Sequence, residues 1–168
     1  PLAKQAASIA LIVAPTDTEL MQNHLVWLLA RENKTGNTDW IQSGLVAWDW
    51  YNKWALEGVD FKTGINTATY KYFIDFSAAN HIPYINLDEG WNHNKRLFDI
   101  NKKLDLHELI RYANEKGVKV FLWFMYDALQ TDLEAKLDSF AAWGAAGMKV
   151  DFFDRDDQKV VAFAEKLA

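Results

Sequence analysis

The residues best suited to chemistry stand in the stretch GMKVDFFDRDD, residues 147–157, where Lys149 and Asp151 interrupt an apolar run. A charge inside a buried strand costs free energy unless it is paired or used. Because side chains alternate along a strand, Lys149 and Asp151 share one face, while Met148, Val150 and Phe152 are expected to pack away from it. The lysine favours the ionised carboxylate, and an ionised carboxylate can act as a nucleophile. A purely structural ion pair is the alternative.

A second acidic pair, Asp88 and Glu89, is followed by Gly90 and Trp91. Carboxylates accept hydrogen bonds from the vicinal hydroxyls of a sugar, and tryptophan offers a flat apolar face, so this turn can bind a sugar ring. An acidic loop with a packing tryptophan is one alternative. A metal site is another, but it needs further oxygen ligands that the spacing does not supply. The four histidines show no HExxH spacing, so no metal site is predicted.

These polar residues share a position, the C-terminal end of an apolar segment. Asp49 ends one such segment between Trp48 and Trp50, and Trp123 with Tyr126 and Asp127 ends another. Parallel α/β folds place their active sites at that rim. We therefore expect one site that contains Asp151, Lys149, Asp88, Glu89, Trp91, Asp49 and Trp123.

The elements that must position this site alternate regularly along the chain. Apolar segments predict strands at 45–51, 83–88, 118–125 and 148–153, and helical patterns predict helices at 66–80, 105–116, 130–143 and 156–167. Four βα units predict the α/β class and the first half of a (β/α)₈ barrel. No phosphate-binding glycine pattern follows the first strand, which disfavours a dinucleotide-binding sheet.

The domain organisation predicted is a lead-in segment at 1–40 and the half-barrel at 41–168. The lead-in is expected to contain a strand at 8–14 and a single helix that is capped by Thr16 or Asp17 and stops near Asn33. Pro1 as the first residue suggests a cut or processed end.

The composition excludes several classes of protein. The net charge of −5, without a basic patch, disfavours nucleic acid as a partner. No apolar run approaches the ~20 residues that span a membrane, and no signal-peptide pattern opens the chain. Absence of cysteine excludes disulfides. Eight tryptophans among 168 residues are many, which hints at flat apolar ligands such as sugar rings.

Three stretches resemble glycoside hydrolase family 97. They are VAWDWYNKWALEGVDFKTGINTATYKYFIDF at 46–76, PYINLDEGW at 83–91 and GMKVDFFDRDDQ at 147–158, in the order the family has them. The resemblance implies a (β/α)₈ barrel between a large β-sandwich and a small β domain. Retaining, α-galactosidase-like members carry an aspartate nucleophile at the end of strand four, and Asp151 matches that position. Asp88, Glu89, Trp91 and Lys149 match sugar-binding positions of related retaining α-galactosidases.

The resemblance therefore implies cleavage of terminal α-galactosides with retention, through a covalent glycosyl-aspartate. It places the acid/base glutamate on a later strand, past Ala168, so the chain alone is expected to be inactive. It also implies Ca²⁺ with ligands largely outside this chain, and a periplasmic or extracellular location. The expected partners are an α-galactoside oligosaccharide and, at the open barrel edge, the rest of the enzyme or a second copy.

Two other functions stay open. The chain could be a non-catalytic half-barrel that binds carbohydrate or associates with itself. It could also belong to an inverting α-glucosidase of the same family, in which Asp151 has no catalytic role. The extent of the chain fits a fragment of a larger enzyme, a deliberate half-barrel or a natural truncation.

Overall fold

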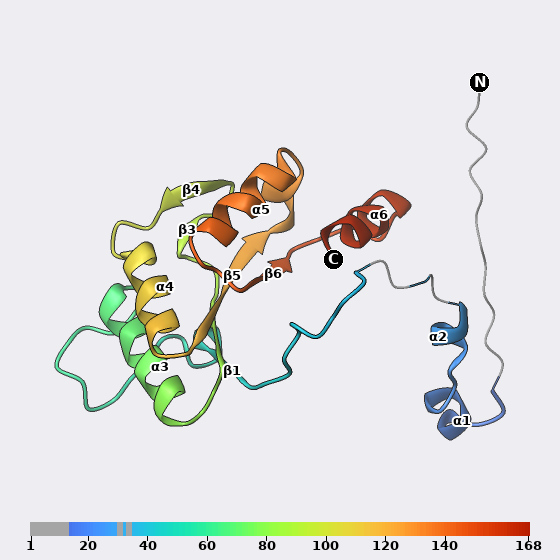
Figure 1. Cartoon of the computed structure of the whole chain (residues 1–168), viewed down its shortest axis with the longest axis horizontal. Helices are drawn as coiled ribbons and strands as arrows, with labels where there is room; N and C mark the ends of the chain where they lie inside the picture. Colours follow the sequence, from blue (N-terminus) through green and yellow to red (C-terminus); the bar gives the residue numbers. More distant parts are fainter. Residues whose placement is uncertain (1–13, 30–31, 33–34) are drawn as a thin grey trace. The chain divides into compact units, whose positions relative to one another are not determined.

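The computed structural model describes residues 14–29, 32 and 35–168 (Figure 1). The chain divides into two compact units, residues 1–42 and 43–168. The strand expected at 8–14 lies outside the described residues except for its last position. How the first unit joins a further domain stays a prediction.

The first unit contains two short helices, α1 (Asp17–Met21) and α2 (Leu25–Leu29). The Thr16 hydroxyl caps α1 by accepting a hydrogen bond from the main-chain N–H of Glu19 at 3.3 Å, as expected. The prediction of a single long helix is wrong. Its interruption has a local cause, because the side chain of Asn23 accepts from the N–H of Leu25 at 2.7 Å and so begins a second helix.

The second unit is built on a parallel sheet. Its strands are β1 (Val46–Trp48), β2 (Tyr84–Leu87), β5 (Lys119–Met125) and β6 (Gly147–Asp151), in the order β1-β2-β5-β6. Spatial order follows chain order without the reversal that marks a doubly wound sheet. The predicted α/β class with four parallel βα units is confirmed, and the order is that of half a (β/α)₈ barrel.

Four helices follow these strands. They are α3 (Thr67–Ala79), α4 (Leu106–Glu115), α5 (Leu133–Ala142) and α6 (Gln158–Leu167). The side chain of Asn66 caps α3 and that of Asp105 caps α4, each accepting from a main-chain N–H three residues on, at 3.0 and 3.1 Å. Gly117, with φ of 75°, ends α4 in the left-handed conformation. These boundaries were predictable from the capping residues.

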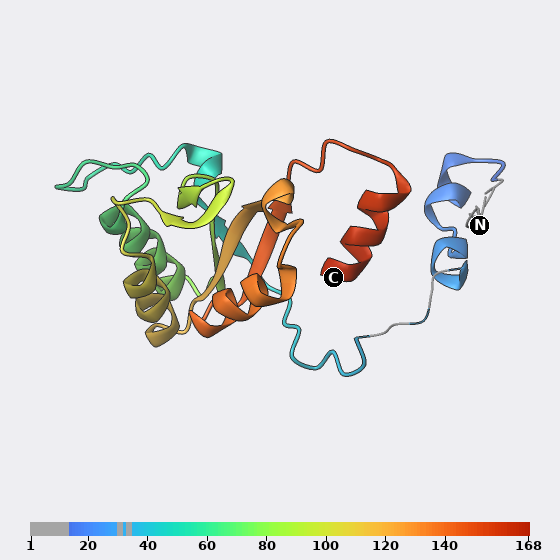
Figure 2. The same cartoon turned by 90° about the horizontal axis from the view of Figure 1, so that it is seen from above.

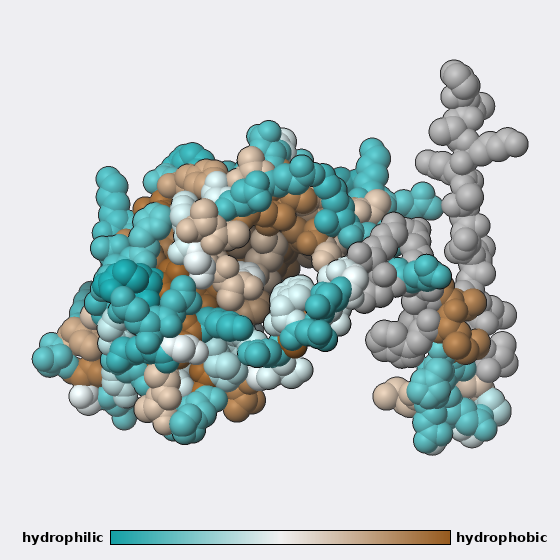
Figure 3. Space-filling model, viewed as in Figure 1, coloured by the Kyte–Doolittle hydropathy of each residue, from teal (hydrophilic) through white to brown (hydrophobic). Residues whose placement is uncertain are grey.

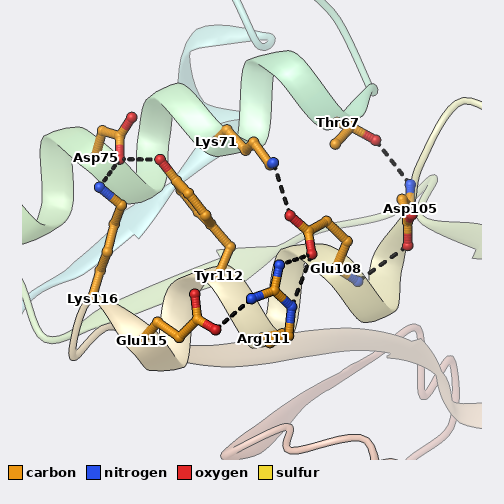
Figure 4. A network of polar contacts seen from close by, with 9 residues as sticks. All are labelled: Thr67, Lys71, Asp75, Asp105, Glu108, Arg111, Tyr112, Glu115 and Lys116. Carbon is orange, nitrogen blue, oxygen red and sulfur yellow. Dashed lines mark hydrogen bonds and ion pairs between the residues drawn. The ribbon is translucent and has the colours of Figure 1, made fainter.

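Helices α3 and α4 lie side by side against the sheet (Figures 1 and 2). A polar network joins their exposed edges (Figure 4). Lys71 pairs with Glu108 at 2.9 Å, and Asp75 binds both the Tyr112 hydroxyl and Lys116 at 2.8 Å. Each such surface contact contributes little stability by itself. The network instead fixes the register of the two helices, of which α3 packs on β2 and α4 packs on β5.

The two faces of the sheet differ in character. One face buries Ile85, Leu87, Val120, Leu122 and Phe124 against the helices. The opposite face carries Lys149 and Asp151, with Asp88 at the end of β2. In the view of Figure 3, the surface of this unit combines hydrophilic side chains with an apolar hollow. The apolar core therefore lies between the sheet and its helices, and the opposite face of the sheet is available for the site.

Three local features differ from the expectations. β1 ends at Trp48, and a 3₁₀ turn, η1 (Asp49–Asn52), replaces its last residues. A second 3₁₀ turn, η2 (Tyr126–Leu129), follows β5. A hairpin that the sequence analysis did not predict, β3 (Asn92–His93) with β4 (Arg96–Ile100), lies between β2 and α4.

Candidate active site

Asp151 ends β6 with both carboxylate oxygens hydrogen-bonded. Oδ1 accepts from the main-chain N–H of Phe152 at 2.9 Å. Oδ2 accepts from the indole N–H of Trp123 at 3.2 Å and lies 3.4 Å from the Lys149 ammonium. Partial burial raises the pKa of Asp151, but the Phe152 N–H, Trp123 and Lys149 outweigh it and leave the pKa below its usual value. The result is an ionised, oriented carboxylate whose side chain is 42% exposed.

Lys149 joins this carboxylate to β2. Its Nζ lies 2.8 Å from Oδ2 of Asp88, whose side chain is only 4% exposed. Burial lowers the pKa of Lys149, but its hydrogen bonds and charge contacts with Asp88 and Asp151 are stronger and raise the pKa overall. The lysine is therefore a permanent cation between two acidic side chains from different strands. The shared face predicted for Lys149 and Asp151 is observed.

Asp88 is held by more donors than any sequence pattern indicated. Its Oδ2 also accepts from the Trp48 indole N–H at 2.5 Å and from the Asn86 amide at 3.0 Å. Its Oδ1 accepts from the main-chain N–H of Glu89 at 2.8 Å. Lys149 lies over the Trp48 ring, 4.8 Å from its centroid, which adds a cation–π contact. With its acceptors occupied, Asp88 orients Lys149 and Trp48.

Trp48 and Asn86 are site residues that the predicted set lacks. Asn86 stands two residues before Asp88 and therefore on the same face of β2, so strand alternation could have identified it. Trp48 stacks on Trp50 with centroids 5.7 Å apart and planes 18° apart, and Tyr51 lies beside it at 5.9 Å. These three rings form an exposed aromatic edge next to Lys149.

Glu89 lies at the end of β2 beside the turn of the β3–β4 hairpin. Its side chain accepts a hydrogen bond from the Asn94 amide in that turn. Glu89 is half-buried rather than sealed, so it retains a carboxylate oxygen for another donor. The structure thus brings Asp88, Glu89, Lys149 and Asp151 to one rim of the sheet, and we call these four residues the carboxylate cluster.

Trp91 does not belong to this rim, and the prediction that it contacts a sugar is wrong. The side chain is 0% exposed, and its indole N–H donates to the main-chain oxygen of Trp123 at 2.7 Å. Its ring packs edge-on against Phe124, 5.6 Å away, within the core. A ring covered on every side offers no face to a ligand.

Asp49 is also enclosed, which contradicts a direct contact with substrate. The 3₁₀ turn directs its carboxylate into the core, where Oδ2 accepts from the Tyr70 hydroxyl at 2.5 Å and from the Trp54 indole at 2.9 Å. Burial raises the pKa of Asp49 despite these two donors, and burial beside Asp49 raises the pKa of Tyr70 as well. Asp49 therefore anchors the segment that carries the aromatic edge.

The Trp123 side chain contacts Asp151 and is not exposed to the solvent in front of that carboxylate. Its side chain is 1% exposed, and its only polar atom is directed at Oδ2 of Asp151. The expected direct contact with substrate is replaced by a contact with the candidate nucleophile. Phe152, which was expected to pack away from Lys149 and Asp151, instead covers Trp123, with ring centroids 5.8 Å apart.

The loop after β6 contains an ion pair between Arg155 and Asp157. Asp157 also accepts from the N–H groups of Lys159 and Val160 and so caps α6. The pair lies outside the carboxylate cluster and closes the loop onto the helix.

Over the part of the chain that the structure describes, no helix has the length and apolar character to cross a membrane. Among the same residues, no three acidic or histidine side chains gather as ligands for a metal ion. We therefore assign no described residue to calcium, and ligands elsewhere in the protein stay a prediction.

The profile of the family Glycoside hydrolase 97 matches residues 49–168, which contain every residue of the carboxylate cluster. The chain belongs to glycoside hydrolase family 97. It is 45% identical over 159 residues to the "Retaining alpha-galactosidase" of Bacteroides thetaiotaomicron, a match that covers 94% of this chain and 24% of that protein. It is 27% identical over 146 residues to a "Probable retaining alpha-galactosidase" of Streptomyces bingchenggensis, covering 83% and 22%.

A solved structure supports the fold. A family 97 enzyme from Pseudoalteromonas sp. strain K8, in complex with acarbose, superimposes with a TM-score of 0.63 at 19% identity, over 77% of this chain and 22% of that one. The chain thus spans about a quarter of the length of the curated relatives it matches.

Proposed function

We propose that this chain is the part of a retaining α-galactosidase that carries the nucleophile, and that the nucleophile is Asp151. The observation that supports this best is the state of the Asp151 carboxylate. Three donors hold it ionised and oriented at a strand end, while nearly half of its side chain stays open. The 45% identity to a protein named as a retaining α-galactosidase supports the substrate class.

The chemistry has two displacements at the anomeric carbon. A carboxylate oxygen of Asp151 forms a bond to that carbon while the glycosidic C–O bond breaks, and the leaving oxygen takes a proton from a second carboxyl group. Water, deprotonated by the same second group, then displaces Asp151 and releases the sugar with its original configuration. The family resemblance assigns the second group to a glutamate on a later strand, which must stand about 5–5.5 Å from Asp151.

Two side chains are free to bind the sugar. The Lys149 ammonium has three N–H groups, and Asp88 and Asp151 occupy two of them. The third can donate to a hydroxyl of the galactose ring. Glu89, with one oxygen on Asn94, can accept from a neighbouring hydroxyl. Asp88 is saturated with donors, so its role in this proposal is to hold Lys149 and Trp48 in place.

The test uses the complete gene product that carries this chain. Asp151→Gly should abolish hydrolysis of an activated aryl α-galactoside. External azide should partly restore turnover by entering the space of the lost carboxylate, and it should give the β-galactosyl azide. Asp154→Gly is the matched control, because Asp154 is exposed and its φ of 47° suits glycine. An Asp151→Gly enzyme with near-normal turnover would show that the assignment is wrong.

The anomer first released from the wild-type protein separates the other functions. Proton NMR of the fresh product should show α-galactose. Initial release of the β-anomer would indicate inversion and leave Asp151 without a covalent role. No turnover on any α-galactoside, with galactose binding retained, would favour the non-catalytic alternative.

A further inference from the structure

The residue after the candidate nucleophile has an unusual backbone conformation. Phe152 has φ of 54°, in the left-handed region that is unfavourable for a residue with a side chain, at about 1–2 kcal/mol. Its side chain is 45% exposed, so burial in the core does not explain the conformation. Strained backbone of this kind persists only where the surroundings determine it.

The left-handed turn has two consequences at Asp151. It ends β6 and turns the main-chain N–H of Phe152 onto Oδ1 of Asp151, at 2.9 Å. It also breaks the alternation of the strand, so the Phe152 ring lies across the ring of Trp123 with planes 77° apart. Trp123 in turn donates its indole N–H to Oδ2 of Asp151. One residue therefore acts on both oxygens of the carboxylate.

We propose that Phe152 is a positioning residue for the nucleophile, which orients Asp151 directly through its main-chain N–H and indirectly by holding the Trp123 ring in place. The inference rests on the proposed function, because orientation of Asp151 matters only if that carboxylate attacks the sugar. Among the aromatic rings of the described residues, Trp123 is the one that the Phe152 ring contacts. Removing the ring should therefore loosen the Trp123 hydrogen bond and leave the Phe152 N–H available.

The charged groups around Asp151 do not depend on Phe152. Lys149 reaches Asp151 from the same strand and is held by Asp88, the residue that follows β2. Phe152→Ala should therefore leave the charges around Asp151 unchanged but disturb the orientation of the Asp151 carboxylate. Because small misplacement of a reacting group is costly, we expect kcat to fall by about tenfold to a hundredfold. KM should change by less than about threefold, since Lys149 and Glu89 still bind the sugar.

A second readout follows from the hydrogen bond itself. The indole N–H favours the ionised form of Asp151. Loosening it should move the acid limb of the kcat/KM profile to higher pH. A residue that acts only on stability would leave that limb in place.

The experiment compares four variants of the complete gene product on an aryl α-galactoside. Phe152→Ala should show the loss of kcat and the shifted acid limb. Phe152→Gly adopts the left-handed turn without strain, so it should match the wild-type unfolding temperature and still show the kinetic loss. Phe152→Tyr keeps the ring and should restore kcat. Phe98→Ala removes a similarly exposed ring that packs on Phe140, and should change nothing in the kinetics.

The outcomes separate this inference from the proposed function. An Asp151→Gly enzyme that stays active refutes the proposed function. If Asp151→Gly is inactive but Phe152→Ala and Phe152→Gly keep wild-type kcat and acid limb, the positioning role is refuted alone. A Phe152→Tyr enzyme as slow as Phe152→Ala also contradicts it, because the ring then has no part in the effect.

Discussion

Replacing Lys149 by methionine removes one charge from the centre of the site and keeps most of the side-chain volume. The loss has three parts, of which the ion pair with Asp151, 3.4 Å away between two partly exposed side chains, contributes least. The hydrogen bond to Asp88, at 2.8 Å, connects a charged donor to a carboxylate whose side chain is 4% exposed. The cation–π contact with Trp48, at 4.8 Å, is lost with it. Asp88 keeps its three neutral donors, so its carboxylate loses one charged partner but still accepts hydrogen bonds at both oxygens.

The size of the effect follows from these contacts. A hydrogen bond to a charged group contributes about 1.5–3 kcal/mol. The Lys149 side chain is 36% exposed, so water screens it and the lower part of that range applies. An exposed cation–π contact contributes about 0.5–1 kcal/mol. We expect Lys149→Met to lower the free energy of unfolding by about 2 kcal/mol.

A double-mutant cycle with Asp88→Asn isolates the pair. Urea unfolding of the wild type, the two single variants and the double variant at neutral pH gives the coupling energy, which we expect to be about 1 kcal/mol or more. The control is Lys166→Met, which breaks an exposed pair with Glu134 and should cost less than about 0.5 kcal/mol. Additive single effects would refute the claim that Asp88 holds Lys149.

The pH dependence of the free energy of unfolding should show separate contributions from the Lys149 ammonium and the Asp151 carboxylate. Burial opposes the charge on Lys149, but Asp88 and Asp151 raise its pKa overall. Its contribution is thus complete below the ordinary lysine value of about 10.4 and is lost as pH rises through the raised pKa. Partial burial likewise opposes the charge on Asp151, but its donors lower the pKa. That contribution is present above about 3.9 and is lost as pH falls through the lowered value. Lys149→Met should remove the alkaline loss.

Two further substitutions test the surroundings of the site by the urea midpoint. Asp49→Ala leaves the Tyr70 hydroxyl without its acceptor and removes one of the two acceptors of the Trp54 indole, which keeps only the Tyr70 oxygen at 3.1 Å. It should cost about 3 kcal/mol, whereas Asp49→Asn keeps an acceptor and should cost less. Equal losses in the two variants would contradict the role of that acceptor. Gly147→Ala would place a Cβ 2.3 Å from Cε1 of Phe121, so we expect a loss of about 1–3 kcal/mol. Wild-type stability in Gly147→Ala would show that Phe121 is not confined there.

The sequence was informative where a local signal decides the structure. Asn66, Asp105 and Gly117 mark helix ends by their own chemistry, and the structure has those ends. The parity of Lys149 and Asp151 is equally local, and the two side chains do share a face. Four strands with apolar cores were enough to predict the parallel sheet.

The burial of the aromatic residues could not be predicted in the same way. Trp91 comes shortly after two acidic residues, but the β3–β4 hairpin that follows it returns to Trp91. The N–H of Asn101, just after β4, donates to the main-chain oxygen of Trp91 at 2.9 Å. That hairpin begins with a strand of only Asn92 and His93, which carries no apolar alternation to detect. The burial of Trp91 could therefore not be predicted from the sequence.

Asp49 and Phe152 were misplaced because each strand was predicted too long. Alternation holds only while the backbone is extended. A 3₁₀ turn at Asp49 directs its carboxylate to Tyr70, which is distant in the sequence, and the left-handed turn at Phe152 carries its ring onto Trp123. Both contacts depend on tertiary structure.

The most direct test of the account is to trap the covalent intermediate. The complete gene product is incubated with a fluorinated galactosyl fluoride that reacts quickly but hydrolyses slowly from the enzyme, then digested and analysed by peptide mass spectrometry. If Asp151 is the nucleophile, the peptide that contains it gains one fluorogalactosyl group, and Asp151→Gly gains no label. A label on another carboxylate, or an unlabelled enzyme that releases the inverted sugar, would contradict it.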